Sequence, residues 1–246
     1  MSLRAVVGLE VHVQLSTASK LFSRSPTLSL PPNEAVSPLD AAHPGVLPLL
    51  SKKAVQIALK SALLLNCAIN KWSTFDRKHY FYADMPAGYQ ITQQANPIAK
   101  DGTFEFYVLD DKSDTKRSVE VLQVQLEQDS GKSIHEERQS LIDLNRSGCA
   151  LVEIVTAPQL SSGLEAASFM RQLRLLFIHH GISHGFMHKG EMRVDANVSL
   201  RGENWNGERT EIKNMNSIAH VESAITYEIE RQREIVKKGG EVIFET

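Results

Sequence analysis

The stretch Met192–Arg201, MRVDANVSLR, alternates apolar and polar side chains without interruption. The apolar side chains are those of Met192, Val194, Ala196, Val198 and Leu200, and the polar ones are those of Arg193, Asp195, Asn197 and Ser199. A period of two predicts a half-buried β-strand with one face against a core. The other face carries a short carboxylate, an amide and an arginine, not the long lysine and glutamate side chains of an ordinary solvated face. This strand is therefore a candidate site for a metal ion and a phosphate.

Other segments of the chain repeat this pattern. Strands are predicted at residues 5–15, 103–109, 117–127, 149–156 and 210–214, and residues 75–93 are predicted to form a strand, a turn and a second strand. Residues 103–127 form a hairpin around the polar turn 110–114. Helices are predicted at residues 52–70, from the capping box Ser162–Glu165 to about residue 180, and from Asn216 or Ser217 to Gly239–Gly240. Residues 23–48 contain six prolines and are predicted to form an irregular loop.

Few of the predicted strands alternate regularly with helices. The predicted fold class is therefore α+β, with a mostly antiparallel or mixed β-sheet and packed helices.

The 246 residues can bury a full core, and the contents of 42% apolar and 23% charged residues are those of a soluble globular protein. The net charge of −2 carries no overall signature of nucleic-acid binding. Cys67 and Cys149 lack the spacing of a metal site and are predicted to be reduced, buried thiols.

The strongest chemical signal is a set of acids on predicted strands. The set comprises Glu10, Glu127, Glu153, Asp195 and Glu211, with His12 beside Glu10. Residues two apart on a strand project from the same face, which places Glu10 and His12 together. Magnesium is usually held by one or two carboxylates and substrate phosphates, while imidazole suits manganese better. The alternative is that these acids are scattered over solvated faces, although Glu153 has only apolar neighbours and a buried unpaired carboxylate is costly.

Two further segments are candidates for contacts with phosphate or nucleic acid. Gly131-Lys132-Ser133 looks like the end of a phosphate-binding loop, but the Walker pattern requires a glycine where Leu126 stands, so that motif is excluded. A looser anion-binding role remains open for Lys132. Residues 77–82, RKHYFY, interleave cations and aromatic rings, as surfaces that stack bases do. A strand that buries Phe81 would give the same letters.

Together these stretches resemble a known family. VGLEVHVQL, SKLFS, HPGVLP, FDRKHYFYADMPAGYQITQ, LEQDSGKS, SLIDLNRSGCALVEIV, MRVDANVSLR and TEIKNMNS occur in the order found in the GatB family, the B subunits of tRNA-dependent amidotransferases. The similar blocks extend from about residue 6 to residue 245. FYADMPAGY is more similar to the mitochondrial branch than to the bacterial one.

The resemblance implies a fold and an activity. Residues 1–246 would form most of a catalytic "cradle" domain, incomplete at its C-terminus, and the helical and tail domains that bind tRNA would be absent. The cradle would use ATP and Mg²⁺ to phosphorylate the side chain of Glu carried by tRNA(Gln). Ammonia, which the amidase subunit releases from glutamine, would then displace phosphate to give Gln-tRNA(Gln). Further implied partners are a small third subunit of the heterotrimer and Glu-tRNA(Gln), with no membrane.

The resemblance also assigns residues. Glu10, His12, Glu127, Glu153 and Asp195 fall in motifs implied to hold metal, with Glu211 as a weaker candidate, and Glu127 and Asp195 are expected to be catalytic. Contacts to phosphate or substrate are expected from Lys78, Tyr82, Lys132, Arg193 and Lys213. One departure is Gln128, which replaces the second acid of the family's Glu-Glu-Asp block. The missing charge is tolerable only if this position lies behind the metal ligands.

Two alternatives remain at this stage. A degenerate cradle could be a non-catalytic scaffold for the amidase and the tRNA, although all five expected ligands are present. An unrelated metal-dependent nucleotide hydrolase would explain the acids but not the ordered blocks. The expected location is the mitochondrial matrix, with the bacterial cytoplasm as the alternative, and this expectation rests on the resemblance.

Overall fold

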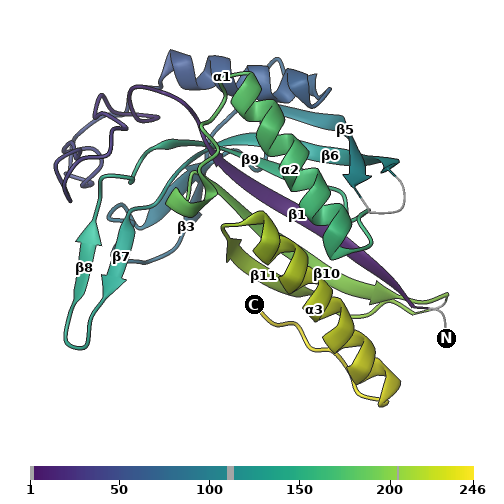
Figure 1. The fold of residues 1–246 in the computed structure, drawn as a ribbon. Coiled ribbons are helices and arrows are strands. Elements are labelled where there is room, and N and C mark those ends of the chain that lie inside the picture. Colours follow the sequence, from purple (N-terminus) through teal and green to yellow (C-terminus); the bar gives the residue numbers. More distant parts are fainter. Residues whose placement is uncertain (1–2, 110–113, 204) are drawn as a thin grey trace.

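The structure, a computed structural model, describes residues 3–109, 114–203 and 205–246. Its centre is a seven-stranded sheet in the order β11-β10-β1-β9-β6-β5-β2 (Figure 1). The strands are β1 (Arg4–Gln14), β2 (Ala68–Ile69), β5 (Ala99–Leu109), β6 (Asp114–Gln128), β9 (Ala150–Thr156), β10 (Met192–Arg201) and β11 (Thr210–Met215). Every neighbouring pair is antiparallel. The prediction of an α+β fold is confirmed, and the sheet is antiparallel throughout.

Helices supply the other half of the core. In the described ranges they are α1 (Lys52–Leu64), α2 (Gly163–His179) and α3 (Ile218–Lys237), and a short 3₁₀ turn, η1, spans Met187–Lys189. Helices α2 and α3 lie side by side over one face of the sheet, while α1 packs against β2, β5 and β6 (Figure 1). Ser162 caps α2 through its side chain, as predicted, and Ser217, one of the two predicted candidates, caps α3 in the same way. No helix in the described part of the chain is long and apolar enough to cross a membrane.

The alternating sequence of the central strands separates core from site. Val7, Leu9, Val11 and Val13 of β1 are buried with Val194, Ala196 and Val198 of β10 in the same apolar core as the helices. The intervening polar residues of these strands therefore project from the opposite face. Helices α2 and α3 lie over the apolar face (Figure 1), so the polar side chains lie outside the core that these helices cover.

Three expectations about individual elements need correction. The helix predicted over residues 52–70 ends at Leu64, because Asn66 adopts a left-handed conformation (φ 53°) and residues 68–69 join the sheet as β2. The hairpin strands are longer than predicted, and residues 110–113 of its turn lie outside the described residues. A hairpin of β7 (Lys132–His135) and β8 (Ser140–Asp143) was not predicted and projects from the body of the molecule (Figure 1).

Residues 75–93 form the predicted strand, turn and strand. Strands β3 (Asp76–His79) and β4 (Tyr89–Thr92) pair with each other as a separate two-stranded sheet. Strand β4 lies next to β6, so the side chains of Gln90 and Thr92 reach the polar face of the main sheet. The proline-rich segment 23–48 contains no helix and no named strand, as predicted.

A buried ion pair secures the proline-rich segment. The Lys20 ammonium is fully buried and lies 3.0 Å from the Asp40 carboxylate. Burial alone would raise the pKa of Asp40, but the Ser37 N–H and the Lys20 charge lower it below its ordinary value of 3.8. Ionised Asp40 therefore contributes stability above about pH 4, and this contribution is lost as the pH falls through the lowered pKa.

We expect Lys20→Met to destabilise the chain by about 3 kcal/mol at pH 7, because it leaves a buried carboxylate without a partner. Denaturant unfolding at pH 7 and at pH 3 measures the effect. The loss of stability on acidification should be smaller in Lys20→Met/Asp40→Leu than in the original chain. An equal loss in both proteins would show that this pair does not contribute to the acid sensitivity.

Candidate functional site

The polar face of the sheet brings together acids from five strands. In the registers of the antiparallel pairs, Glu10 of β1 lies opposite Asp195 of β10, and His12 lies opposite Glu153 of β9. Residues directly opposite in an antiparallel pair project from the same face, so their side chains meet. All six residues predicted to bind metal lie here, in two groups of three whose ligand atoms are within 4.8 Å of one another.

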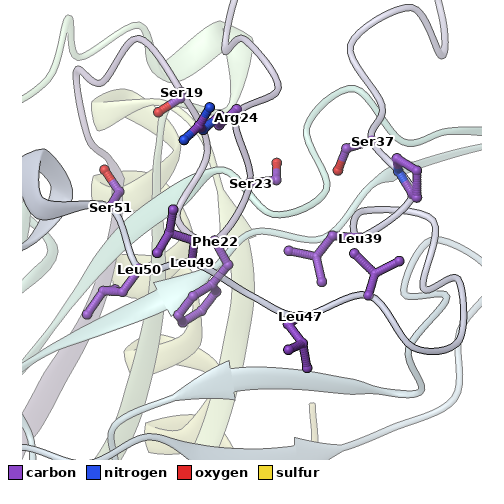
Figure 2. A pocket seen from close by; sticks show the side chains of 12 residues that line it. Ser19, Phe22, Ser23, Arg24, Ser37, Leu39, Leu47, Leu49, Leu50 and Ser51 are labelled. Carbon is purple, nitrogen blue, oxygen red and sulfur yellow. The ribbon is translucent and has the colours of Figure 1, made fainter.

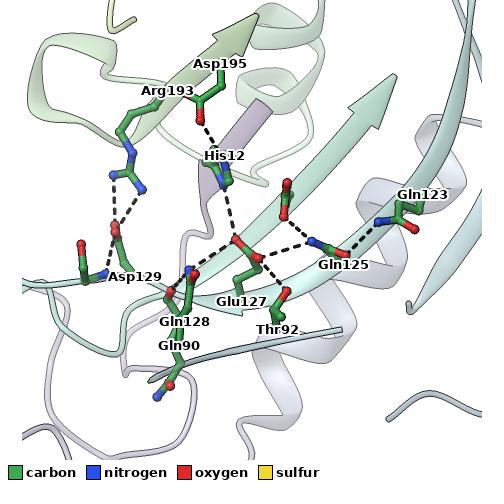
Figure 3. Close-up of polar contacts among 12 residues, drawn as sticks. His12, Gln90, Thr92, Gln123, Gln125, Glu127, Gln128, Asp129, Arg193 and Asp195 are labelled. Atoms are coloured by element: carbon green, nitrogen blue, oxygen red, sulfur yellow. Dashed lines mark hydrogen bonds and ion pairs between the residues drawn. The ribbon is translucent and has the colours of Figure 1, made fainter. Parts of the chain in front are cut away.

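The first group, called the histidine triad, is His12, Glu127 and Glu153. His12 Nδ1 lies 3.3 Å from Glu127 Oε2, and the Gln125 amide donates hydrogen bonds to both carboxylates (Figure 3). The Thr92 hydroxyl donates to Glu127 Oε1 at 2.6 Å. Both carboxylates are buried, which explains why each is held by neutral donors that fix its orientation.

The second group, called the acidic triad, is Glu10, Asp195 and Glu211. The Asn197 amide donates to Glu10 at 3.0 Å, and the Asn214 backbone N–H donates to Asp195 at 2.7 Å. His12 Nε2 lies 3.8 Å from Asp195 Oδ2 (Figure 3). The imidazole therefore stands between the two triads.

The electrostatics of the triads reflect an excess of carboxylates. Burial and then the charge of Glu127 raise the pKa of Glu153 to about 8. Burial alone would lower the pKa of His12, but its contacts with Asp195 and Glu127 raise it to about 10. The same contact with His12 lowers the pKa of Glu127, against the effect of burial. Burial and the charge of Glu127 thus favour the protonated form of Glu153, and the neighbouring carboxylates favour the imidazolium form of His12.

The residues predicted to contact phosphate or substrate are less closely gathered. Lys213 lies 3.3 Å from Glu211 of the acidic triad. Both Nη atoms of Arg193 contact Asp129, at 3.2 and 3.0 Å. Lys78 and Tyr82 are exposed on and after β3. Exposed Lys132 begins β7 and lines a polar pocket of about 340 Å³ together with Arg146.

Gln128, which stands where the family's Glu-Glu-Asp block has its second acid, lies outside both triads. Its side-chain oxygen accepts a hydrogen bond from the backbone N–H of Ile91 on β4 at 3.4 Å, and it belongs to neither triad. A neutral amide serves this contact as well as a carboxylate would. Loss of the second acid of the block therefore removes no carboxylate from the triads.

Several residues of the site were not singled out from the sequence. Gln125 is two residues from Glu127 on the same strand, so both side chains project from the same face, and this spacing could have indicated Gln125 as a member of the site. Asn197, by contrast, was identified from the sequence as the amide beside Asp195 on the polar face of its strand, and only its contact with Glu10 was not. Thr92 comes from a separate two-stranded sheet, and Asp129 lies just beyond the end of β6, so neither was indicated by strand alternation.

A second cavity lies in the proline-rich segment. It has a volume of about 310 Å³ and is lined mainly by apolar side chains, among them Phe22, Leu39 and Leu47, with Arg24 at its edge (Figure 2). It shares no lining residue with either triad. This cavity therefore does not belong to the acidic site.

The fold and the site together define an α+β domain whose sheet carries, on its polar face, two groups of side chains that could hold a metal ion. The chain belongs to the GatB/GatE catalytic domain family, whose sequence pattern matches residues 5–244. It is 51% identical to the mitochondrial glutamyl-tRNA(Gln) amidotransferase B subunit of Danio rerio and 51% identical to the protein of the same name in Homo sapiens, over 98% of this chain and 45% of each relative. It is 48% identical to the aspartyl/glutamyl-tRNA(Asn/Gln) amidotransferase B subunit of Wolbachia sp. subsp. Drosophila simulans, over 98% of this chain and 50% of the relative. The chain spans about half the length of these relatives.

Proposed function

We propose that this domain activates the side-chain carboxylate of Glu on tRNA(Gln) by phosphorylation with ATP and Mg²⁺, and that ammonia then converts the activated carboxyl to an amide. The observation that carries the proposal is the meeting of two triads of metal-type ligands on the polar face of one sheet. The names of the relatives support the substrate and the overall reaction. Phosphorylation is chemically apt, because it replaces a poor leaving oxygen with phosphate, which ammonia can displace.

The donor atoms of both triads suit a divalent cation. Five of the six side chains are carboxylates, the hard oxygen ligands that Mg²⁺ prefers, and the donor atoms lie within 4.8 Å of one another in each triad. Glu127 and Glu153 are both buried, and burial together with the charge of Glu127 raises the pKa of Glu153 to about 8, so a bound cation would favour its ionised form. When bound, Mg²⁺ would neutralise charge on the transferred phosphoryl group.

The residues of the chain itself would position the reactants. Gln125, Thr92 and Asn197 hold the carboxylates of the triads in fixed directions, which reduces the reorganisation needed on binding. Glu127 and Asp195, on either side of His12, are the proposed catalytic acids. Contacts with phosphate or substrate are assigned to Lys78, Tyr82, Lys132, Arg193 and Lys213.

The remaining parts of the proposal follow from the relatives' names and from the resemblance. Each relative is named as one subunit of a larger enzyme, which supports partner chains, and we propose a small third subunit in addition to the amidase. Two of the most similar relatives are named mitochondrial, which supports the mitochondrial matrix as the location. Bacterial relatives match almost as well, so the bacterial cytoplasm is the alternative.

Release of phosphate from ATP tests the function directly. In the enzyme assembled from this protein and its partners, we expect Glu-tRNA(Gln) to raise phosphate release at least tenfold over uncharged tRNA(Gln) or no tRNA, because the acceptor of the phosphoryl group is the Glu side chain. Equal release under all three conditions would point to a nucleotide hydrolase. No release under any of them would point to a scaffold.

A further inference from the structure

A charged cluster outside both triads is built around Asp129. This carboxylate is only 2% exposed and accepts hydrogen bonds from both Nη atoms of Arg193, at 3.0 and 3.2 Å (Figure 3). Arg146 Nε lies 3.5 Å from the same carboxylate, and the Ser130 backbone N–H donates to it at 2.9 Å. A two-point contact between a guanidinium and a carboxylate fixes the orientation of both groups.

The location of Arg193 makes this contact relevant to the site. Arg193 lies directly opposite His12 in the register of β1 and β10, and it is two residues from Asp195 on the same strand face. The negative charges of Asp195 and Glu127 both act on its guanidinium. Arg193 Nη1 also donates to the Gly190 carbonyl at 2.9 Å, but Asp129 is the carboxylate that it contacts directly. Without the charge of Asp129, the guanidinium would be left beside the acids of the triads, where its positive charge opposes that of a metal cation.

Arg146 contacts the backbone of the loop that follows Asp129. Its Nε donates to the Ser130 carbonyl at 3.0 Å and its Nη2 donates to the Gly131 carbonyl at 2.7 Å. The Gly131 N–H in turn donates to the Asp84 carbonyl at 2.8 Å. These contacts fix the loop that carries Asp129 directly after β6, so the carboxylate is presented to Arg193 from a rigid support.

We infer that Asp129 is a positioning residue: it restrains Arg193 so that the carboxylates of the two triads stay available to a divalent cation. Arg146 supports this role by holding the Asp129 loop in place. The inference rests on the proposed function, since it assumes that the triads bind metal. It assigns Asp129 no contact with the metal, the nucleotide or the charged tRNA.

The test is a double-variant experiment with Mn²⁺, read by electron paramagnetic resonance on the full chain. Asp129→Asn should weaken Mn²⁺ binding at least tenfold, because the charge of Arg193 is then left beside the acids without that of Asp129. Asp129→Asn/Arg193→Leu should bind Mn²⁺ within about threefold of the original chain. Glu105→Gln, an exposed acid-to-amide change on β5, is the matched control and should have no effect.

A double variant that binds no better than Asp129→Asn would overturn the inference, since loss of structure in the loop would not be relieved by removing Arg193. If Asp129→Asn fails to fold, the comparison of Arg193→Lys with Arg193→Leu decides instead. Arg193→Lys keeps the positive charge but cannot make the two-point contact with Asp129. It should therefore bind Mn²⁺ at least fivefold more weakly than Arg193→Leu, and equal binding by these two variants would reject the inference. A failure of the original chain to bind Mn²⁺ would count against the proposed function itself.

Discussion

Asp195→Asn is expected to abolish amide formation on Glu-tRNA(Gln), with a loss of about a thousandfold or more, while the assembled enzyme keeps its glutaminase activity. The Asn214 N–H donates to Asp195 Oδ1, and an asparagine can accept the same hydrogen bond. The change therefore removes one charge from the acidic triad with little effect on packing. A thousandfold corresponds to about 4 kcal/mol of transition-state stabilisation, within the range supplied by a bound metal ion.

The measurement is the formation of Gln-tRNA(Gln) beside the release of ammonia from glutamine. Glu127→Gln should behave in the same way, because the Thr92 hydroxyl can still donate to its side-chain oxygen. Glu105→Gln, which lies on β5 outside both triads, should leave both activities intact. Loss of both activities in Asp195→Asn would indicate a defect in folding or assembly, and full amide formation would exclude Asp195 from the reaction.

Glu153→Gln is expected to stabilise the metal-free chain and to abolish its stabilisation by magnesium. Glu153 and Glu127 are both buried in the histidine triad, and the charge of one opposes ionisation of the other. A neutral amide needs no proton to stay uncharged, which removes the free-energy cost of protonating Glu153 on folding at pH 7, and it can still accept the hydrogen bond from Gln125. Relief of strain at functional sites commonly raises stability by about 1 kcal/mol.

Thermal unfolding in a chelator and in excess Mg²⁺ measures both effects. The original chain should gain stability with Mg²⁺, because the ion binds the native state only, and the variant should not gain. The Tm of Glu153→Gln in chelator should exceed that of the original chain by a few degrees. Equal stabilisation of both proteins by Mg²⁺ would place the ion outside the histidine triad.

Much of the fold could be predicted from local patterns. The alternation at Met192–Arg201 predicted β10 and its two faces, and Ser162 and Ser217 predicted the starts of two helices. Apolar spacing could not show where the helix at residues 52–70 ends, because Asn66 breaks it through a backbone conformation and not through loss of that spacing. The β7–β8 hairpin was missed because its residues are mostly exposed and lack a buried face.

The candidate site, like the fold, could be predicted from the sequence only in part. Residue type and strand phase could name all six members of the two triads, but the pairing of His12 with Glu153 depends on the register of two strands far apart in the chain. Arg193 was expected to contact phosphate, and its two-point contact with Asp129 depends on a loop whose path the sequence did not indicate. Long-range register and loop geometry were therefore the missing information.

The proposed function requires the acids on the polar face of the sheet to bind a divalent cation. Binding of Mn²⁺ by the original chain, Glu10→Gln and Asp195→Asn, measured by electron paramagnetic resonance, tests it most directly. We expect the original chain to bind Mn²⁺ and both variants, still folded, to bind it at least tenfold more weakly, a difference of about 1.4 kcal/mol. Equal binding by all three proteins would contradict this expectation and would exclude Glu10 and Asp195 as metal ligands.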